Sequence, residues 1–239
     1  MTHHYRDLNL TDPANGYLHF VVQAEARLGV ARSLLNAEVS LAVQTPFLQE
    51  WVARLVRCEP NALHCAIVEP RQIPTLFHPC IEEDGEASPV AADCVCRKAM
   101  YDPEFGLPVV VQHANITGSA DVTRWIYRTF APLALRPHDS FGSLIVDRDG
   151  SLWVRTGEGI LSLLPQSRAL GYDFGYDGGG PHALAAYLSQ VAATDGQVTA
   201  AGAPYARAHP AILAWTQSSA VEQGARELTL IDLKEMRRS

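Results

Sequence analysis

The sequence predicts an α+β protein: an N-terminal helical hairpin, a central mixed region, and a C-terminal β-hairpin followed by a glycine loop and a helix. Apolar residues recur at helical spacing early in the chain, and short apolar runs stand between prolines in its middle. A hairpin turn then precedes a glycine-rich segment. With 239 residues, 47% of them hydrophobic, the chain can bury one large core or two modest ones.

Two helices are expected before residue 60. Residues 21–44 carry apolar side chains that approximate the three-to-four-residue spacing of a buried helical stripe. Thr45-Pro46 then fits an N-cap followed by a first-turn proline, and a second apolar stripe runs from Phe47 to Val56. We expect the two helices to pair as a hairpin.

The central region has recurrent prolines and an acidic loop at Glu82–Glu86. Its short apolar runs predict strands at Leu63–Val68 and Leu107–Gln112. The spacing of apolar residues in Asp121–Phe130 predicts a helix.

The last part of the chain is expected to begin with a β-hairpin, because Asp147-Arg148-Asp149-Gly150 is a turn sequence between two apolar runs. The following elements are predicted around and after it: strands at 143–146, 152–155 and 160–164, helices at 181–191 and 210–215, and a late strand at 228–233. A boundary near residue 137 gives two parts, residues 1–137 and 138–239, which can also form one continuous domain.

Three consecutive glycines, Gly178, Gly179 and Gly180, precede Pro181 and His182. Proline suits the first position of a helix, so this segment predicts a loop leading into a helix N-terminus. Such an end exposes backbone N–H groups and can bind a phosphate or carboxylate near His182. The alternative is that the glycines only allow tight packing. The segment fits neither a Walker A loop nor the dinucleotide-binding glycine spacing.

The same segment resembles a small, uncharacterised prokaryotic and phage family. That family carries Gly-Tyr-Gly-Gly-Ser-Gly-Pro before a Leu-Ala helix, with an aromatic residue just before the motif. The matching residues here are Phe174, Gly175, Tyr176, Gly178, Gly180, Pro181, Leu184 and Ala185. Asp177 replaces a family glycine and Gly179 replaces the serine. The resemblance covers residues 140–218 and implies a bacterial or mobile-element protein with a compact C-terminal α+β module, but transfers no activity.

All five cysteines lie between Cys58 and Cys96, together with two histidines. His78, Cys80, Cys94 and Cys96 could supply four ligands to a structural zinc ion. Their spacing differs from the usual Cys-x-x-Cys knuckles, so ordinary thiols or a redox or catalytic thiol are alternatives. An odd number of cysteines argues against a disulfide framework.

Two further arrangements could carry chemistry. Cys65 or Cys80 could pair with His113 or His138 as a nucleophile and base, if the fold brought them together. Asp147 and Asp149 could share one face of an extended segment and bind a metal, although their sequence context favours a hairpin turn. No catalytic residue is assigned.

Composition narrows the functional classes. A net charge of −7 without a basic cluster argues against nucleic-acid binding. The absence of a long apolar run or secretion signal predicts a cytoplasmic protein without a membrane span. The preferred function is a non-catalytic binding or regulatory protein of a bacterium, phage or mobile element, acting on a protein partner. The alternatives are binding of a small anionic ligand at residues 178–182 and a metal-dependent enzyme that uses the Cys/His cluster.

Overall fold

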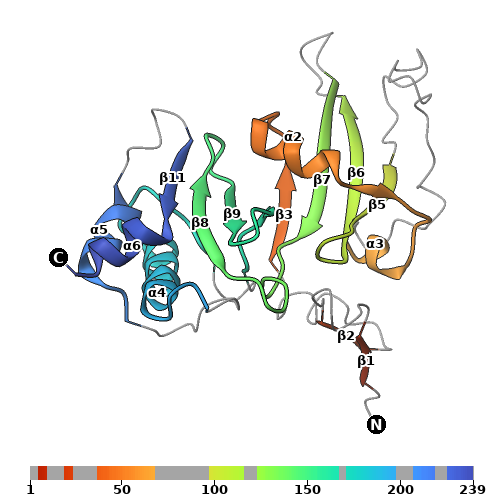
Figure 1. Cartoon of the computed structure of the whole chain (residues 1–239). Coiled ribbons are helices and arrows are strands. Elements are labelled where there is room, and N and C mark those ends of the chain that lie inside the picture. The colour runs from red at the N-terminus through yellow and green to blue at the C-terminus, as the bar shows by residue number, and fades with distance from the viewer. Residues whose placement is uncertain are drawn as a thin grey trace.

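The computed structural model describes residues 5–9, 19–23, 37–67, 97–115, 123–166, 171–197, 207–218 and 225–238. Within them the fold is rich in strands: a five-stranded and a four-stranded antiparallel sheet lie beside each other (Figure 1). Strands β1 (Tyr5–Asn9) and β2 (His19–Gln23) form a separate antiparallel pair. The chain passes from the larger sheet to the smaller one at residues 131–140.

The larger sheet has the strand order β3-β7-β6-β5-β4. Its strands are β3 (Glu38–Leu41), β4 (Val56–Arg57), β5 (Arg97–Asp102), β6 (Leu107–Asn115) and β7 (Thr123–Phe130). The short helix α3 (Ala62–Ile67) packs its buried Leu63 and Ile67 into the same apolar cluster as Val110 of β6.

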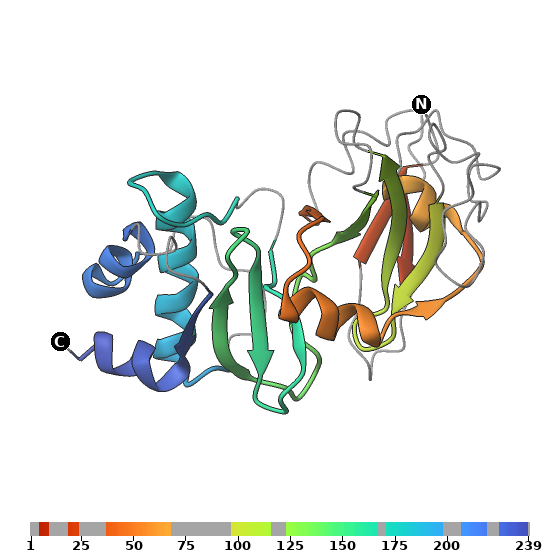
Figure 2. The same cartoon turned by 90° about the horizontal axis from the view of Figure 1, so that it is seen from above.

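The smaller sheet has the order β10-β9-β8-β11. Its strands are β8 (Phe141–Val146), β9 (Leu152–Thr156), β10 (Leu161–Leu163) and β11 (Arg226–Thr229). Helices α4 (Gly179–Ala193), α5 (Pro210–Gln217) and α6 (Leu230–Met236) lie on one side of this sheet (Figure 2). Buried Leu184, Tyr187 and Leu188 of α4 join Leu144 and Val154 of the sheet in one apolar cluster.

Helix α2 (Pro46–Ala53) joins the two sheets through a second apolar cluster. Trp51, fully buried, packs with Val109 of the larger sheet and with Ile145 and Trp153 of the smaller one. The rings of Trp51 and Trp153 are 6.1 Å apart between centroids. Because their burial removes large apolar areas from water, the two tryptophans are main stabilising residues of the inter-sheet core.

The predicted α+β arrangement headed by a helical hairpin is wrong. Residues 21–23 and 38–41 of the expected first helix lie in strands β2 and β3, and residues 24–36 lie outside the described part. In β3, Glu38 and Ser40 are exposed whereas Leu41 is buried, a pattern typical of a strand at the edge of a sheet. The second expected helix is present as α2, and the Thr45 hydroxyl accepts a hydrogen bond from Leu48 N–H at 3.1 Å.

Two central elements also differ from expectation. Residues 123–130, expected in a helix, form β7, which pairs with both β6 and β3. Residues 63–67, expected in a strand, lie in the helix α3. Asn61 caps the N-terminus of that helix, because its side-chain Oδ1 accepts a hydrogen bond from Leu63 N–H at 2.9 Å. In β7, pairing with two neighbouring strands outweighs the helical spacing of the apolar residues. In α3, the cap outweighs the strand-like run of apolar residues.

Predictions for the later part of the chain are mostly confirmed. The β8–β9 hairpin, β10, α4 and α5 all lie where the sequence places them, as does β6 in the central region. The expected late strand at 228–233 is confirmed only up to Thr229, where α6 begins. Thr229 and Asp232 form a capping box, which explains why the strand ends there. In the part of the chain described here, no helix has the length and apolar character needed to cross a membrane.

Candidate functional site

The glycine loop leads directly into α4, as predicted. Gly178 is the extended N-cap residue, and Gly179, Gly180 and His182 follow in the first turn. A Cβ on Gly180 would lie 2.5 Å from Cβ of Asp173 and 3.1 Å from the backbone oxygen of Gly171, so this position excludes a side chain. A Cβ on Gly179 would meet nothing within 4 Å. Tight packing therefore explains why residue 180 is a glycine, but it does not explain the glycine at position 179.

The loop is fixed by α5. Gly175, with a φ of +91°, donates a backbone hydrogen bond to Thr216 O at 2.8 Å. The buried Thr216 hydroxyl in turn donates to the backbone oxygen of Pro181 at 3.1 Å. Phe174 meets Trp215 edge-on, with 5.0 Å between ring centroids, and the Arg226 guanidinium lies 4.9 Å from the Trp215 ring. These contacts hold the loop in one conformation.

A carboxylate of the protein itself lies at the start of α4. Asp177 Oδ1 accepts a hydrogen bond from Gln217 Nε2 at 2.7 Å and lies 3.5 Å from His182 Nε2. All three side chains are near the surface. The negative charge of Asp177 opposes an anion beside His182, and Pro181 removes one backbone donor. The predicted binding residues are thus brought together, but their surroundings weaken the case for an anionic ligand.

The predicted zinc ligands His78, Cys80, Cys94 and Cys96 lie outside the described residues. Among the residues that are described, no three or more His, Cys, Asp or Glu side chains are grouped to hold a metal. The structure does bring together Cys58 and the buried His64, whose Sγ and Nε2 atoms are 3.6 Å apart. Neither residue belongs to a Cys–His pair predicted from the sequence.

The chemistry of Cys58 and His64 argues against an activated thiolate. His64 Nε2 is 2.8 Å from the backbone oxygen of Met100, and since a carbonyl oxygen only accepts, this nitrogen carries a hydrogen. It therefore cannot accept the thiol proton. Burial raises the pKa of Cys58, with a smaller contribution from Glu59, and burial lowers the pKa of His64. Both groups consequently favour their neutral forms.

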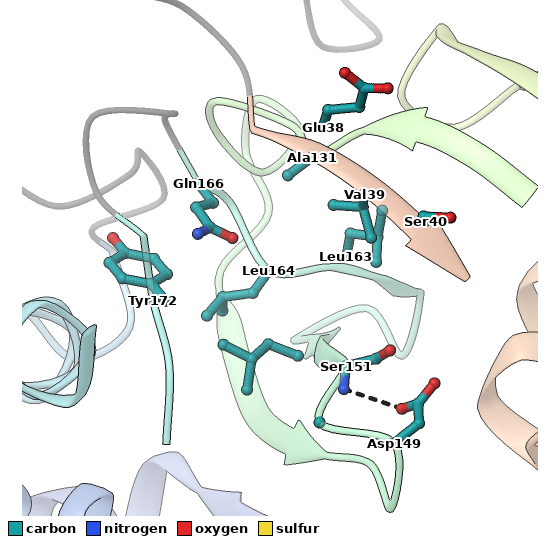
Figure 3. Close-up of a pocket in the computed structure, with 12 residues that line it drawn as sticks. Glu38, Val39, Ser40, Ala131, Asp149, Ser151, Leu163, Leu164, Gln166 and Tyr172 are labelled. Atoms are coloured by element: carbon teal, nitrogen blue, oxygen red, sulfur yellow. Dashed lines mark hydrogen bonds between the residues drawn. The ribbon is translucent and has the colours of Figure 1, made fainter. Parts of the chain in front are cut away.

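A hollow of about 270 Å³ lies between the two sheets (Figure 3). Edge strand β3 of the larger sheet and edge strand β10 of the smaller one both contribute to its wall. Its described lining consists of Glu38, Val39, Ser40, Ala131, Asp149, Gly150, Ser151, Leu152, Leu163, Leu164, Gln166 and Tyr172. Several of these residues are exposed, so the hollow is open to solvent.

Backbone contacts fix the relative position of its walls. Ala37 N–H donates to Gln166 O at 3.3 Å, and Gln166 N–H donates to Pro132 O at 2.9 Å. Tyr172 forms part of the wall and stacks on the fully buried Tyr187, with 5.7 Å between ring centroids. The hollow is therefore a preformed feature of the fold.

The hairpin turn forms another part of the wall. Asp149 is exposed, and its Oδ1 accepts a hydrogen bond from Ser151 N–H at 3.0 Å. Asp147 is 2% exposed, and its Oδ1 accepts from Arg148 N–H at 2.8 Å. One carboxylate thus points to solvent and the other is buried, an arrangement that fits the hairpin interpretation better than a shared metal site.

Sequence reasoning missed the hollow because its described lining comes from five separate segments of the chain. The sequence predicts a hairpin turn at Asp147–Gly150, with a metal-binding pair as the alternative, and it predicts a helix for the residues of β3. Single-sequence spacing carries no signal that β3 and β10 face one hollow. Comparisons with family models, with curated proteins and with solved structures gave no match for the chain.

Proposed function

We propose that this is a non-catalytic binding protein that recognises an extended segment of a protein partner at the hollow between its sheets. The observation that carries this proposal is the open hollow of about 270 Å³ beside the edge strands β3 and β10. Edge strands offer backbone groups to an added extended segment, and adjacent pockets can select its side chains.

The size and lining of the hollow support a side chain as its occupant. Pockets for small molecules and cofactors usually measure about 300–1,000 Å³, and this one is smaller. The lining combines apolar residues, Val39, Leu163 and Leu164, with polar residues such as Ser40 and Ser151. Such a mixture suits one amphipathic side chain of a longer segment whose backbone runs outside the hollow.

The resemblance of the glycine loop supports a setting in a bacterium, phage or mobile element, and we expect the protein to act in the cytoplasm. In this proposal the loop and α5 form a rigid support for the smaller sheet. The contacts of Gly175 and Pro181 with Thr216 favour that role. Rigid elements of this kind hold a recognition surface in place.

The test is a selection of displayed random peptides against the full-length protein. Selected peptides are then measured on Ser40→Trp, which fills the hollow from an exposed strand position, and on Ala193→Trp, which adds the same bulk at the exposed end of α4. We expect binding to be lost in Ser40→Trp and kept in Ala193→Trp. Failure to select any peptide, or equal binding to both variants, would contradict the proposal.

A further inference from the structure

We propose that Arg97 and Arg128, on one face of the larger sheet, bind the phosphate group of a small molecule; this inference does not depend on the proposed function. Arg97 stands on β5 and Arg128 on β7, with β6 between them (Figure 1). Arg97 is paired with Gln112 of β6, and Arg128 with Val110, two residues earlier on the same strand. Because side chains alternate between the faces of a sheet, both arginines and Gln112 share one face.

Arg97 is a buried charge without a counter-charge among the described residues. It is 5% exposed, and its Nε atom is buried with no hydrogen-bond partner there. Neither Arg97 nor Arg128 belongs to an ion pair in that part of the chain. Arginine keeps its proton in proteins, so a buried guanidinium is stable only when other groups bind its charge. An anion supplies such contacts.

The charge of Arg128 makes the isolation of Arg97 less favourable. Burial lowers the pKa of Arg97, and the nearby charge of Arg128 lowers it further. Two like charges held close together repel each other unless an opposite charge lies near both. Glu38 of β3 lies diagonal to Arg128 in the register, but it forms no ion pair with Arg128. The two arginines are thus a local positive site in a chain whose net charge is −7.

The charges of the site favour a phosphate group over a carboxylate. A phosphate monoester carries a charge of about −1.5 to −2 near pH 7, which matches two guanidinium groups, whereas a carboxylate carries only one charge. The planar guanidinium can donate two parallel hydrogen bonds to phosphate oxygens.

Gln112 completes the site. Its Oε1 atom is buried without a hydrogen-bond partner among the described residues. The carboxamide can accept from a phosphate O–H or, when turned over, donate to a phosphate oxygen. The same ligand would therefore bind the unpartnered groups of both Arg97 and Gln112.

The exposure of these residues favours a small ligand. Arg128 and Gln112 are half-buried, so an ion can reach them from solvent. Arg97 is too buried for the surface of a macromolecule to contact its guanidinium broadly. The start of α4 differs in charge, because Asp177 places a carboxylate beside His182 there.

The probe is inorganic phosphate, added to the isotope-labelled full-length protein. The Nε–H signal of Arg97 reports binding directly, because this group is buried and has no partner among the described residues. We expect the signal to shift with phosphate until binding saturates. Sodium chloride at the same ionic strength should not produce this shift, which separates binding from screening. Acetate should bind about tenfold more weakly, since it carries a single charge.

Three variants separate the arginine pair from general electrostatics. Arg97→Gln and Arg128→Gln each remove one charge of the pair, and we expect calorimetry to show phosphate binding weakened about tenfold in each. Arg128 is only half-buried, so its variant keeps the test available if Arg97→Gln does not fold. Arg237→Gln removes an equal charge from the exposed end of α6 and should leave phosphate binding unchanged.

An Arg97 Nε–H signal that does not respond to phosphate would overturn this inference, and so would equal weakening in all three variants. Acetate that bound as tightly as phosphate at equal ionic strength would refute the preference for a phosphate group. The peptide selection judges the proposed function separately, because it measures binding of peptides at the hollow without phosphate.

Discussion

Arg54 and Asp102 form a two-pronged ion pair that links α2 to the end of β5. Arg54 Nε donates to Asp102 Oδ1 at 3.0 Å, and Arg54 Nη2 donates to Asp102 Oδ2 at 2.6 Å. The aspartate, which is fully buried, also accepts from Trp51 Nε1 at 2.9 Å and from Glu104 N–H at 3.0 Å. Arg54 Nη1 donates to Leu161 O of β10, so the pair connects both sheets.

Replacing Asp102 by alanine should therefore destabilise the fold strongly. The change leaves the Arg54 guanidinium and the Trp51 indole N–H without their acceptor in a water-poor environment. Breaking a buried pair from one side costs about 3–5 kcal/mol in the free energy of unfolding. Urea denaturation monitored by tryptophan fluorescence measures this loss.

The matched control is the exposed pair of Glu50 and Arg155. Arg155 also contacts both oxygens of its partner, at 2.8 and 2.9 Å, but 46% of the Glu50 side chain is exposed. Glu50→Ala should cost no more than about 1 kcal/mol, because water screens the pair. If the two variants proved equally stable, the difference in burial would not govern these ion pairs.

Two neighbouring glycines should respond differently to the same substitution. In Gly180→Ala the new methyl group meets the backbone of Gly171 and the Cβ of Asp173, so we expect a loss of about 1–3 kcal/mol in the free energy of unfolding. In Gly179→Ala the methyl group enters open space, and the smaller entropy of the unfolded chain should raise stability by up to about 1 kcal/mol. Thermal unfolding of both variants tests this order; the reverse order would contradict the packing interpretation.

The elements that the sequence predicts correctly are marked by local signals. The β8–β9 hairpin follows from Asp147–Gly150, and α2 follows from Thr45 and Pro46, which lie next to the elements they define. In the glycine loop, Pro181 falls in the first turn of α4 for the same reason. Each signal acts within a few residues, so it can be read without knowing the fold.

The wrong predictions of secondary structure concern elements whose conformation depends on strands that are distant in the sequence. Glu38 pairs with Phe130, and Leu41 pairs with Tyr127, so β3 and β7 stabilise each other across a long stretch of chain. Their apolar residues also fit a helical stripe, and spacing alone does not separate the two cases. The hollow was missed for the same reason, because Ser40 and Leu163 are brought near it only by tertiary folding.

The zinc hypothesis predicts about one zinc ion per chain in the purified, untagged protein. Chelation should make Cys80, Cys94 and Cys96 more reactive towards an alkylating reagent, because metal-bound thiolates are protected. Cys58 serves as the internal control: burial raises the pKa of its thiol, so its slow alkylation should not change on chelation. Elemental mass spectrometry and peptide mapping give both results. Absence of metal, with the same alkylation before and after chelation, would refute the hypothesis.

His64 should make stability depend on pH in the mildly acidic range. Burial lowers its pKa in the folded state below the ordinary value of about 6.5. As pH falls below that value, the unfolded chain binds a proton that the folded chain does not, and the free energy of unfolding decreases. The decrease ends once pH has passed the folded-state pKa, and its slope from this one group is at most about 1.4 kcal/mol per pH unit.

His64→Gln removes the titration while keeping an amide that can donate to Met100 O. The variant should therefore show a shallower loss of stability between neutral and mildly acidic pH than the unaltered protein. Comparing the two slopes, rather than the two stabilities, cancels any constant packing cost of the substitution. Chemical denaturation at a series of pH values supplies these slopes. If the free energy of unfolding changed with pH in the same way in both proteins, His64 would be protonated equally in the folded and unfolded states. Its burial beside Cys58 and Met100 would then not disfavour the charged imidazole.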